Sequence, residues 1–267
     1  MNKRHLIAAC LTAVIVLGFM WWIYDQEFHF KNTEAGRMAA VTEYIPQASD
    51  STIRHGVKEG TPIQVVDWET IGKRLFIFYK AENNENVNGI MQLVRGINGK
   101  YRAVQADMSP SPYMDGIYGG MLTPRDTDQH LFYLAGSNCE DISSAKVKYF
   151  AMYYNGEDSY EVEQTYELSE ANFLWIMEME ELIYELNLQE QDIVRVYLDA
   201  RAVQLFDQTG NDVTAQYRNE EMDASWGGGK STVDLSLLYI IEGVIGVLGF
   251  IIVYGLLKKD DESIEPV

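Results

Sequence analysis

The stretch LIAACLTAVIVLGFMWWIY at residues 6–24 decides the fold of this chain, because it is almost wholly apolar and carries no charge. A second stretch, LSLLYIIEGVIGVLGFIIVYGLL at residues 235–257, contains a single charged side chain, Glu242. A helix needs about 20 residues to cross about 30 Å of hydrocarbon, and both stretches have roughly that length. The sequence therefore predicts one transmembrane helix near each end of the chain.

Basic residues flank the two stretches on their terminal sides. They are Lys3, Arg4, Lys258 and Lys259. The positive-inside rule keeps such flanks in the cytoplasm. We therefore expect residues 1–5 and the tail at residues 258–267 to be cytoplasmic, and residues 25–233 to lie outside the cytoplasm.

The first stretch ends in large rings: Trp21, Trp22 and Tyr24. Aromatic side chains are typical of the belt at a membrane interface, whereas a signal-peptide cleavage site needs small residues. We interpret residues 6–24 as an uncleaved signal anchor. The three rings, together with Lys258 and Lys259, are the predicted membrane-interface anchors.

Between the two stretches the chain is strongly acidic. Residues 25–233 hold 34 of the 40 acidic residues but only 17 of the 21 Lys and Arg residues. Such a surface repels polyanions, which argues against nucleic-acid binding. Residues 149–194 contain no Lys, Arg or His. This segment is either a solvated face or a docking surface for a basic partner or divalent cations.

The two cysteines lie in different surroundings, because Cys10 belongs to the first apolar stretch and Cys139 to the middle of the chain. An intramolecular disulfide would need a thiol from inside the bilayer, so none is predicted. Large extracytoplasmic domains without disulfides are common in bacteria that have a single membrane. We therefore expect the plasma membrane of a bacterium.

Strand signals dominate residues 25–224. The predicted strands are residues 63–68, 75–79, 90–94, 101–106, 131–134, 147–153, 160–166, 193–198 and 203–206. Asn-Gly pairs at residues 98–99 and 155–156 predict hairpins with type I′ turns, in which both central residues have positive φ. Hairpins with short turns build antiparallel sheets.

Two helices are predicted in the same region. The first covers residues 34–44 and ends before Pro46. The second and longest covers residues 170–188, and its apolar face is Ile176, Met179, Ile183 and Leu186. The expected fold class is an α+β ectodomain, with antiparallel β-hairpins and helices on one face, held between two terminal transmembrane helices. Residues 225–234 read as a Gly-rich linker.

Glu242 is the most informative single residue, because it lies about 10 Å into the second apolar stretch. A carboxylate there is costly and usually faces protein or water. Gly243, Gly246 and Gly249 provide a small-residue surface for close helix approach. We predict that these four residues contact another membrane helix, either the first helix of the same chain or one from another protein or copy. The alternative is a protonated or snorkelling side chain.

Three further patterns match known sites only in part. Residues 227–232, GGGKST, lack the first glycine of a P-loop. His130 and Cys139, with Asp126 or Asp128, offer the residue types of a nucleophilic group, although no spacing selects them. Residues 207–212, DQTGND, do not follow the ligand order of an EF-hand and read as a β-turn. No cofactor, metal or catalytic set is predicted.

The sequence therefore favours a non-catalytic, membrane-tethered extracytoplasmic module that binds or regulates a cell-envelope protein partner, or assembles with further copies. One alternative is a ligand- or ion-sensing protein that signals through its membrane helices. A second is a surface hydrolase whose carboxylates meet only in the folded chain.

Overall fold

The computed structural model describes residues 3–47, 62–82, 84–108, 116–122, 130–153, 159–188, 193–198, 203–218, 229–231 and 235–258. The chain divides into two compact units. The first, here called the helical unit, comprises Met1–Lys31, Arg95–Arg102 and Thr232–Val267. The second, here called the β unit, comprises Asn32–Val94 and Ala103–Ser231.

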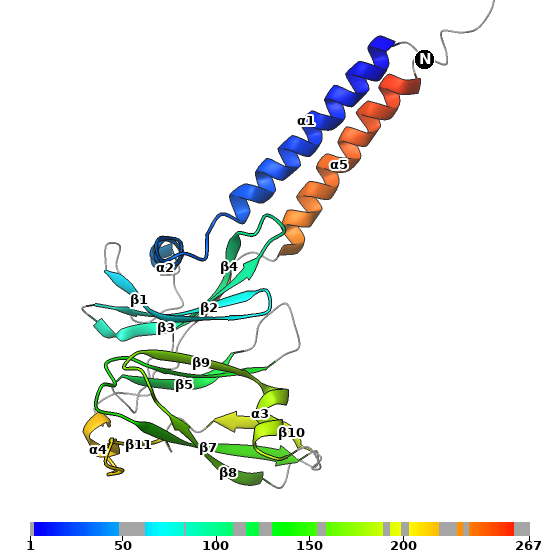
Figure 1. Ribbon diagram of the computed structural model, residues 1–267. Coiled ribbons are helices and arrows are strands. Elements are labelled where there is room, and N and C mark those ends of the chain that lie inside the picture. The colour runs from blue at the N-terminus through cyan, green and yellow to red at the C-terminus, as the bar shows by residue number, and fades with distance from the viewer. Residues whose placement is uncertain are drawn as a thin grey trace, which may run out of the picture. The chain divides into compact units, whose positions relative to one another are not determined.

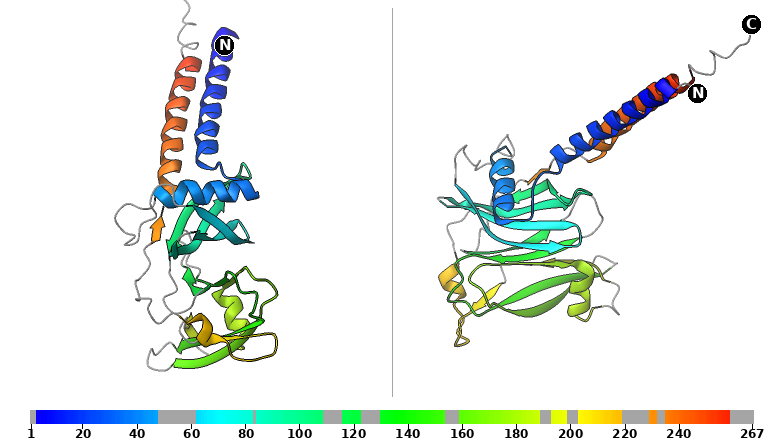
Figure 2. Two further views of the ribbon diagram at one scale, coloured as in Figure 1. Left: turned by 90° about the vertical axis from the view of Figure 1, so that its left-hand side faces the viewer. Right: turned by 45° about the horizontal axis from the view of Figure 1, so that its top comes forward.

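The helical unit contains two long helices, α1 (Lys3–Glu27) and α5 (Leu235–Lys258). They lie side by side and antiparallel in all views (Figures 1 and 2). Each contains an apolar window with a mean hydropathy of 2.4, of which only 6% is buried. The prediction of two terminal helices long and apolar enough to cross a membrane is confirmed. Because their apolar surfaces are mostly exposed, these helices are not the core of a soluble domain.

The described residues of the β unit form three sheets. The five-stranded sheet has the order β1 (Ile63–Ile71), β2 (Arg74–Ala81), β3 (Asn84–Arg95), β4 (Tyr101–Met108) and β12 (Gly229–Ser231). The three-stranded sheet has the order β5 (Ile117–Leu122), β6 (Leu131–Gly136) and β9 (Phe173–Glu178). In the four-stranded sheet β7 (Ser144–Tyr153) pairs with β8 (Ser159–Glu167), β10 (Ile193–Leu198) and β11 (Gln204–Phe206). Its pairs are antiparallel, as are those of the three-stranded sheet.

In the part of the β unit that the structure describes, the helices are α2 (Glu34–Gln47), α3 (Met179–Glu185) and α4 (Thr214–Tyr217). Helix α2 lies on the five-stranded sheet, where the Arg37 guanidinium sits 3.4 Å from the ring centre of Trp68 in β1. The prediction of antiparallel sheets with helices is confirmed, although the described strands form three sheets rather than a single sheet. Helix α2 also runs three residues past the predicted end at residue 44.

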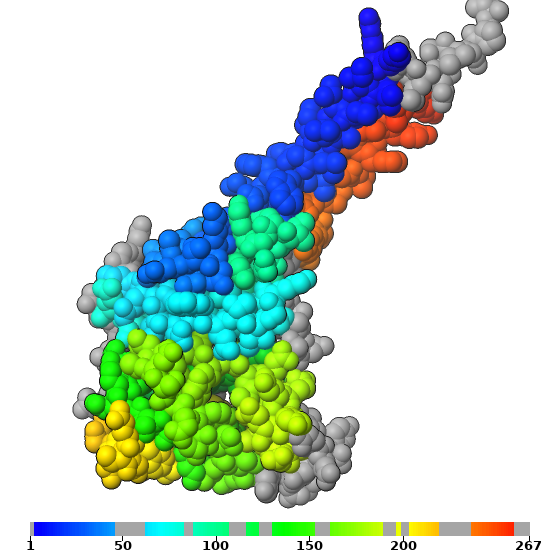
Figure 3. Space-filling view, in the orientation of Figure 1, coloured from blue at the N-terminus to red at the C-terminus, as the bar shows by residue number. Residues whose placement is uncertain are grey.

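The three-stranded sheet lies between the other two (Figure 1), and all six residues of its central strand β6 are buried. In the space-filling view the cyan residues of the five-stranded sheet lie directly against the green and lime residues below them (Figure 3). Alternate residues of a strand point to opposite faces. Phe173 therefore packs toward β7 and α3, in a core with Val147 and Leu182. Leu174 packs on the other face, in a core with Phe78 of β2. Among the described residues, apolar cores therefore fill the space on both faces of the three-stranded sheet.

The prediction of one long helix over residues 170–188 is wrong. Residues Phe173–Glu178 form β9, paired with β6 from Gly136↔Phe173 to Leu131↔Glu178, and only Met179–Glu185 are helical. A strand buried on both faces is a continuous apolar run, which periodicity cannot distinguish from a buried helix. The bulky Phe-Leu-Trp-Ile run at residues 173–176 favours a strand.

Part of the predicted linker also pairs. Within residues 225–234 the structure describes Gly229–Ser231, and these form β12 against Ala106 and its neighbours in β4. The second predicted hairpin is present as β7 and β8, but its Asn-Gly pair at residues 155–156 lies outside the described residues.

Candidate functional site at the Tyr24 end of the helix pair

The end of α1 that carries Tyr24 holds the turn between β3 and β4, residues 95–102, within the helical unit. The Tyr24 hydroxyl accepts a hydrogen bond from the Ile97 amide at 2.9 Å. Phe30, just after α1, exchanges two backbone hydrogen bonds with Tyr101 at 3.0 and 2.7 Å. Gly96 has no side chain because Phe28 and Tyr24 occupy that space: a Cβ there would lie 2.6 Å from each of them. We call this set of contacts the juxtamembrane clamp.

Charged side chains complete the juxtamembrane clamp. Asp25 accepts two hydrogen bonds of 2.8 Å from the Lys100 ammonium and one of 2.8 Å from the Asn98 amide. The Lys100 bond, helped by that of Asn98, lowers the pKa of Asp25. Glu27 forms an ion pair with Arg102, whose side chain is 7% exposed. Two acids and two bases, each pair spaced by two residues, therefore neutralise one another where α1 ends.

The turn inside the juxtamembrane clamp is not the predicted type I′ turn. Only Gly99 has positive φ, at 76°, and Asn98 does not. The Gly96 amide donates to Lys100 and the Gly99 amide to Gly96, which is a three-residue loop ending in a left-handed glycine. The Asn98 side chain instead donates to Asp25 and to the Phe28 carbonyl, so contacts with α1 decide its conformation.

The two helices pack along one face of each. Leu238 of α5 packs against Tyr24 and Phe28. About two turns further along α5, a Cβ added to Gly246 would lie 4.0 Å from the Met20 side chain of α1. A Cβ added to Gly249 would lie 2.8 Å from the Val16 side chain. The glycines at residues 246 and 249 thus face α1, where small residues permit close approach.

The other candidate residues of α5 divide between two surroundings. Glu242 is partly buried on the face that carries Leu238, four residues before, and it interacts electrostatically with Tyr24. Gly243 is exposed, and an added Cβ would meet nothing within 4 Å. The structure therefore brings Glu242, Gly246 and Gly249 to α1 and leaves Gly243 on the outer surface.

The predicted interface anchors also differ from one another. Trp21 and Trp22 are 51% and 56% exposed, as lipid-facing rings would be. Tyr24 is 7% exposed, so its ring belongs to the juxtamembrane clamp and not to an outward-facing belt. Lys258 is exposed at the end of α5, whereas Lys259 lies outside the described residues.

The sequence alone did not identify the residues of the juxtamembrane clamp that contact α1 from the turn between β3 and β4. They are Gly96, Asn98, Lys100 and Arg102. One signal was available, since residues 95–102 contain three bases and no acid in a strongly acidic region. The matching acids Asp25 and Glu27 follow the first apolar stretch. Only the fold, however, shows that these segments, more than 70 positions apart in sequence, are neighbours.

Replacing Gly96 with valine is expected to open the juxtamembrane clamp. The new methyl groups would overlap the rings of Phe28 and Tyr24, which cannot retreat without breaking the Tyr24–Ile97 hydrogen bond. Overpacking of this kind costs about 1–3 kcal/mol, so amide exchange at Ile97 and Tyr101 should accelerate about 5- to 150-fold. Hydrogen exchange on the full chain in detergent measures this, with Arg95→Lys as the control. Unchanged protection in Gly96→Val would contradict the geometry.

His130 and Cys139, the described residues of the candidate nucleophilic group, do not come together. They lie at opposite ends of β6, whose six residues extend about 20 Å. Cys139 is 1% exposed, and its thiol contacts the Gly116 carbonyl at 3.8 Å. Burial raises the pKa of this thiol to about 12, so it is protonated at neutral pH. Asp126 and Asp128 lie outside the described residues.

The Cys139 thiol is therefore expected to resist alkylation in the native chain. With Cys10→Ala as background, iodoacetamide should label Cys139 about 100-fold or more slowly than an exposed cysteine, because only the accessible thiolate reacts. Gln208→Cys, in an exposed turn of the β unit, is the matched control, and mass spectrometry reads both rates. Equal rates at the two positions would refute the buried placement.

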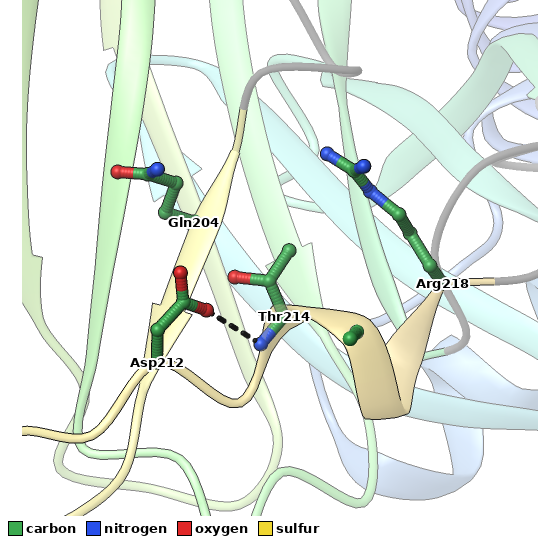
Figure 4. A pocket seen from close by; sticks show the side chains of 5 residues that line it. Gln204, Asp212, Thr214 and Arg218 are labelled. Atoms are coloured by element: carbon green, nitrogen blue, oxygen red, sulfur yellow. Dashed lines mark hydrogen bonds between the residues drawn. The ribbon is translucent and has the colours of Figure 1, made fainter.

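Two open, polar pockets formed by described residues of the β unit lie near α4. The larger, about 660 Å³, is lined by Gln204, Asp212, Thr214, Ala215 and Arg218, and Figure 4 shows the Asp212 carboxylate bonded to the Thr214 amide at 2.9 Å. The smaller, about 380 Å³, includes Asp141 and Asp207.

The Asp207 carboxylate accepts hydrogen bonds within its own turn. It accepts them from the amides and side chains of Thr209 and Asn211, and these bonds lower its pKa to about 2. Gly210 has a φ of 82° and donates to the Asp207 carbonyl, which confirms the predicted β-turn at residues 207–212. A carboxylate of such low pKa is a poor general acid. Among the described residues no cluster of three or more His, Cys, Asp or Glu side chains is placed to hold a metal ion.

Part of the acidic segment at residues 149–194 lies on β8 and α3. Glu161 and Glu163 of β8 pair with Lys148 and Lys146 of β7. On α3 the exposed residues are Glu180, Glu181, Tyr184 and Glu185, and the Tyr184 side chain is 72% exposed. Leu182 of the same helix is fully buried in the core. Helix α3 thus fixes an acidic surface around one protruding ring, here called the α3 face.

Comparisons with protein-family models, with curated proteins and with solved structures found no match to this chain.

Proposed function

We propose that this chain is a non-catalytic, membrane-tethered module that presents its β unit outside the cytoplasm and binds or regulates a protein partner in the cell envelope. The α3 face is the observation that carries the proposal. Exposed Tyr residues are enriched at the centres of protein interfaces, and the three glutamates around Tyr184 complement a basic surface.

In this proposal α1 and α5 cross the plasma membrane of a bacterium, with both termini in the cytoplasm and residues 25–233 outside it. The support is the basic flanks Lys3, Arg4 and Lys258 at the end of the helix pair where α1 begins and α5 stops. The exposed apolar sides of the packed helices α1 and α5 also support the proposal, because these are the surfaces that would face lipid.

Photo-crosslinking in intact membranes tests the proposed binding. Tyr184→p-benzoylphenylalanine in the full chain should give a discrete crosslinked adduct containing a second protein. Replacing the three glutamates of the α3 face with glutamine should abolish that adduct while leaving the fold intact. The same crosslinker at Gln208 is the control position. A chain that gives no adduct at residue 184 and elutes alone in mild detergent would refute the proposal.

The juxtamembrane clamp favours the second candidate, an extracytoplasmic ligand- or ion-sensing protein that signals through its membrane helices. A sensor needs a defined contact between the outer part of the chain and a membrane helix, and the turn at residues 95–102 makes such a contact with α1. In that case Gly96→Val should change the yield or pattern of the residue 184 adduct although the α3 face is untouched. An unchanged adduct would count against signalling through the juxtamembrane clamp.

A further inference from the structure

Ile97, at the tip of the turn held by the juxtamembrane clamp, is 82% exposed. A single exposed apolar residue is ordinary on a protein surface. This one has a special place, because its amide is bonded to the Tyr24 hydroxyl, where the first apolar stretch of the chain ends.

The packing of the helices shows which side chains lie near the Tyr24 end of α1. Leu238 of α5 packs against Tyr24 and Phe28. The residues of α5 next to Leu238 therefore lie beside the end of α1 that contacts residues 95–102. Their outward side chains are apolar and exposed: Leu237 47%, Tyr239 55%, Ile240 60% and Ile241 42%. The apolar surface of α5 therefore continues beyond the level at which α1 becomes acidic.

Two acids and two bases at this level are paired within the chain. Asp25 bonds Lys100, and Glu27 bonds Arg102. Ion pairing lowers the cost of placing such groups near hydrocarbon. The turn thus offers the membrane an apolar tip, Ile97, and an exposed cation, Arg95, of a kind that interacts with lipid phosphates.

We propose that the turn at residues 96–100 enters the outer membrane interface, with Ile97 among the lipid chains just below the headgroups. The occupant of this surface is the lipid of the bilayer that α1 and α5 span, so the inference rests on the proposed membrane location. The turn is a third membrane contact beside the two helices, and it fixes the depth at which α1 leaves the bilayer.

Spin-label accessibility on the full chain in phosphatidylcholine nanodiscs tests this contact. Single labels at Ile97→Cys, Phe19→Cys and Gln208→Cys, in a Cys10→Ala background, are compared for collision with oxygen, which concentrates in lipid, and with a water-soluble nickel chelate. Residue 19 reports the span of α1, and residue 208 reports an aqueous turn. We expect residue 97 to favour oxygen over nickel at least several-fold more than residue 208 does.

Three other results have distinct meanings. If residue 97 resembles residue 208 while residue 19 favours oxygen, the interfacial contact is refuted and the membrane span stands. If residue 97 is inaccessible to both reagents, protein covers it instead of lipid, and the inference is again overturned. If residue 19 also favours nickel, the membrane location itself fails, and the inference fails with it.

Discussion

Replacing Gly136 with alanine is expected to cause a large loss of stability in the β unit. Gly136 ends β6 directly opposite Phe173 of β9. A Cβ at this position would lie 2.1 Å from the Cε1 atom of Phe173 and 2.6 Å from Cζ, far inside van der Waals contact. The Phe173 side chain is 5% exposed in a packed core, so its ring has little room to move. Overpacking of this kind costs about 1–3 kcal/mol or more.

Thermal or urea unfolding of the full chain in detergent, followed by near-ultraviolet circular dichroism, measures this loss. Phe173→Leu is the matched second change, since it removes the ring that the new methyl meets. The double variant Gly136→Ala/Phe173→Leu should be less destabilised than the sum of the two single variants, with a coupling of about 0.5–3 kcal/mol. Additive effects would mean that the methyl and the ring do not meet.

Removal of the Glu69 carboxylate is also expected to destabilise the β unit. Among the described strands β9 lies at the edge of its sheet, and the amides of residues 174 and 176 point away from β6. The Ile176 amide donates to Glu69 of β1 at 2.8 Å, and the Leu174 amide donates to Asp67. Two acidic side chains of the five-stranded sheet therefore accept hydrogen bonds from the edge of the three-stranded sheet. Glu69→Ala leaves the Ile176 amide without its acceptor in a largely buried place, which costs about 1–3 kcal/mol.

The matched variant Glu69→Gln keeps an acceptor oxygen but cannot ionise. It should be less destabilising than Glu69→Ala at neutral pH. Equal losses for the two variants in urea unfolding would indicate that the hydrogen bond to Ile176 is not the cause.

The direction in which the pKa of Glu69 shifts also predicts how the stability difference between the wild type and Glu69→Gln depends on pH. Burial raises the pKa of Glu69 above its ordinary value of 4.5, although the Ile176 amide partly opposes this. A raised folded pKa means that the folded chain takes up the proton first. The stability of the wild type relative to Glu69→Gln should therefore be greatest below pH 4.5 and fall as pH rises through the folded pKa. Unfolding midpoints of both chains across this range measure it, and a difference that grows with pH would be the opposite of this expectation.

The sequence alone determined the elements that depend on local chemistry. The two terminal helices followed from length and hydropathy, since a helix that satisfies its own backbone can be recognised without its neighbours. Most strands were predicted, for example residues 75–79 within β2 and 193–198 as β10, because their composition and turns are local. The β-turn at residues 207–212 was predicted for the same reason.

Only the tertiary structure decided where patterns were ambiguous or partners distant. Residues 173–178 are a strand because sheets cover both of their faces, and no local period reports that cover. The turn at residues 98–99 departs from type I′ because Asn98 bonds α1, about 70 residues away in sequence. The sequence suggested that Glu242, Gly246 and Gly249 would contact a membrane helix, but it gave no means to separate them from Gly243 or to find the Asp25–Lys100 pair. Hydropathy is summed along the chain, whereas the juxtamembrane clamp consists of contacts between segments that only folding brings together.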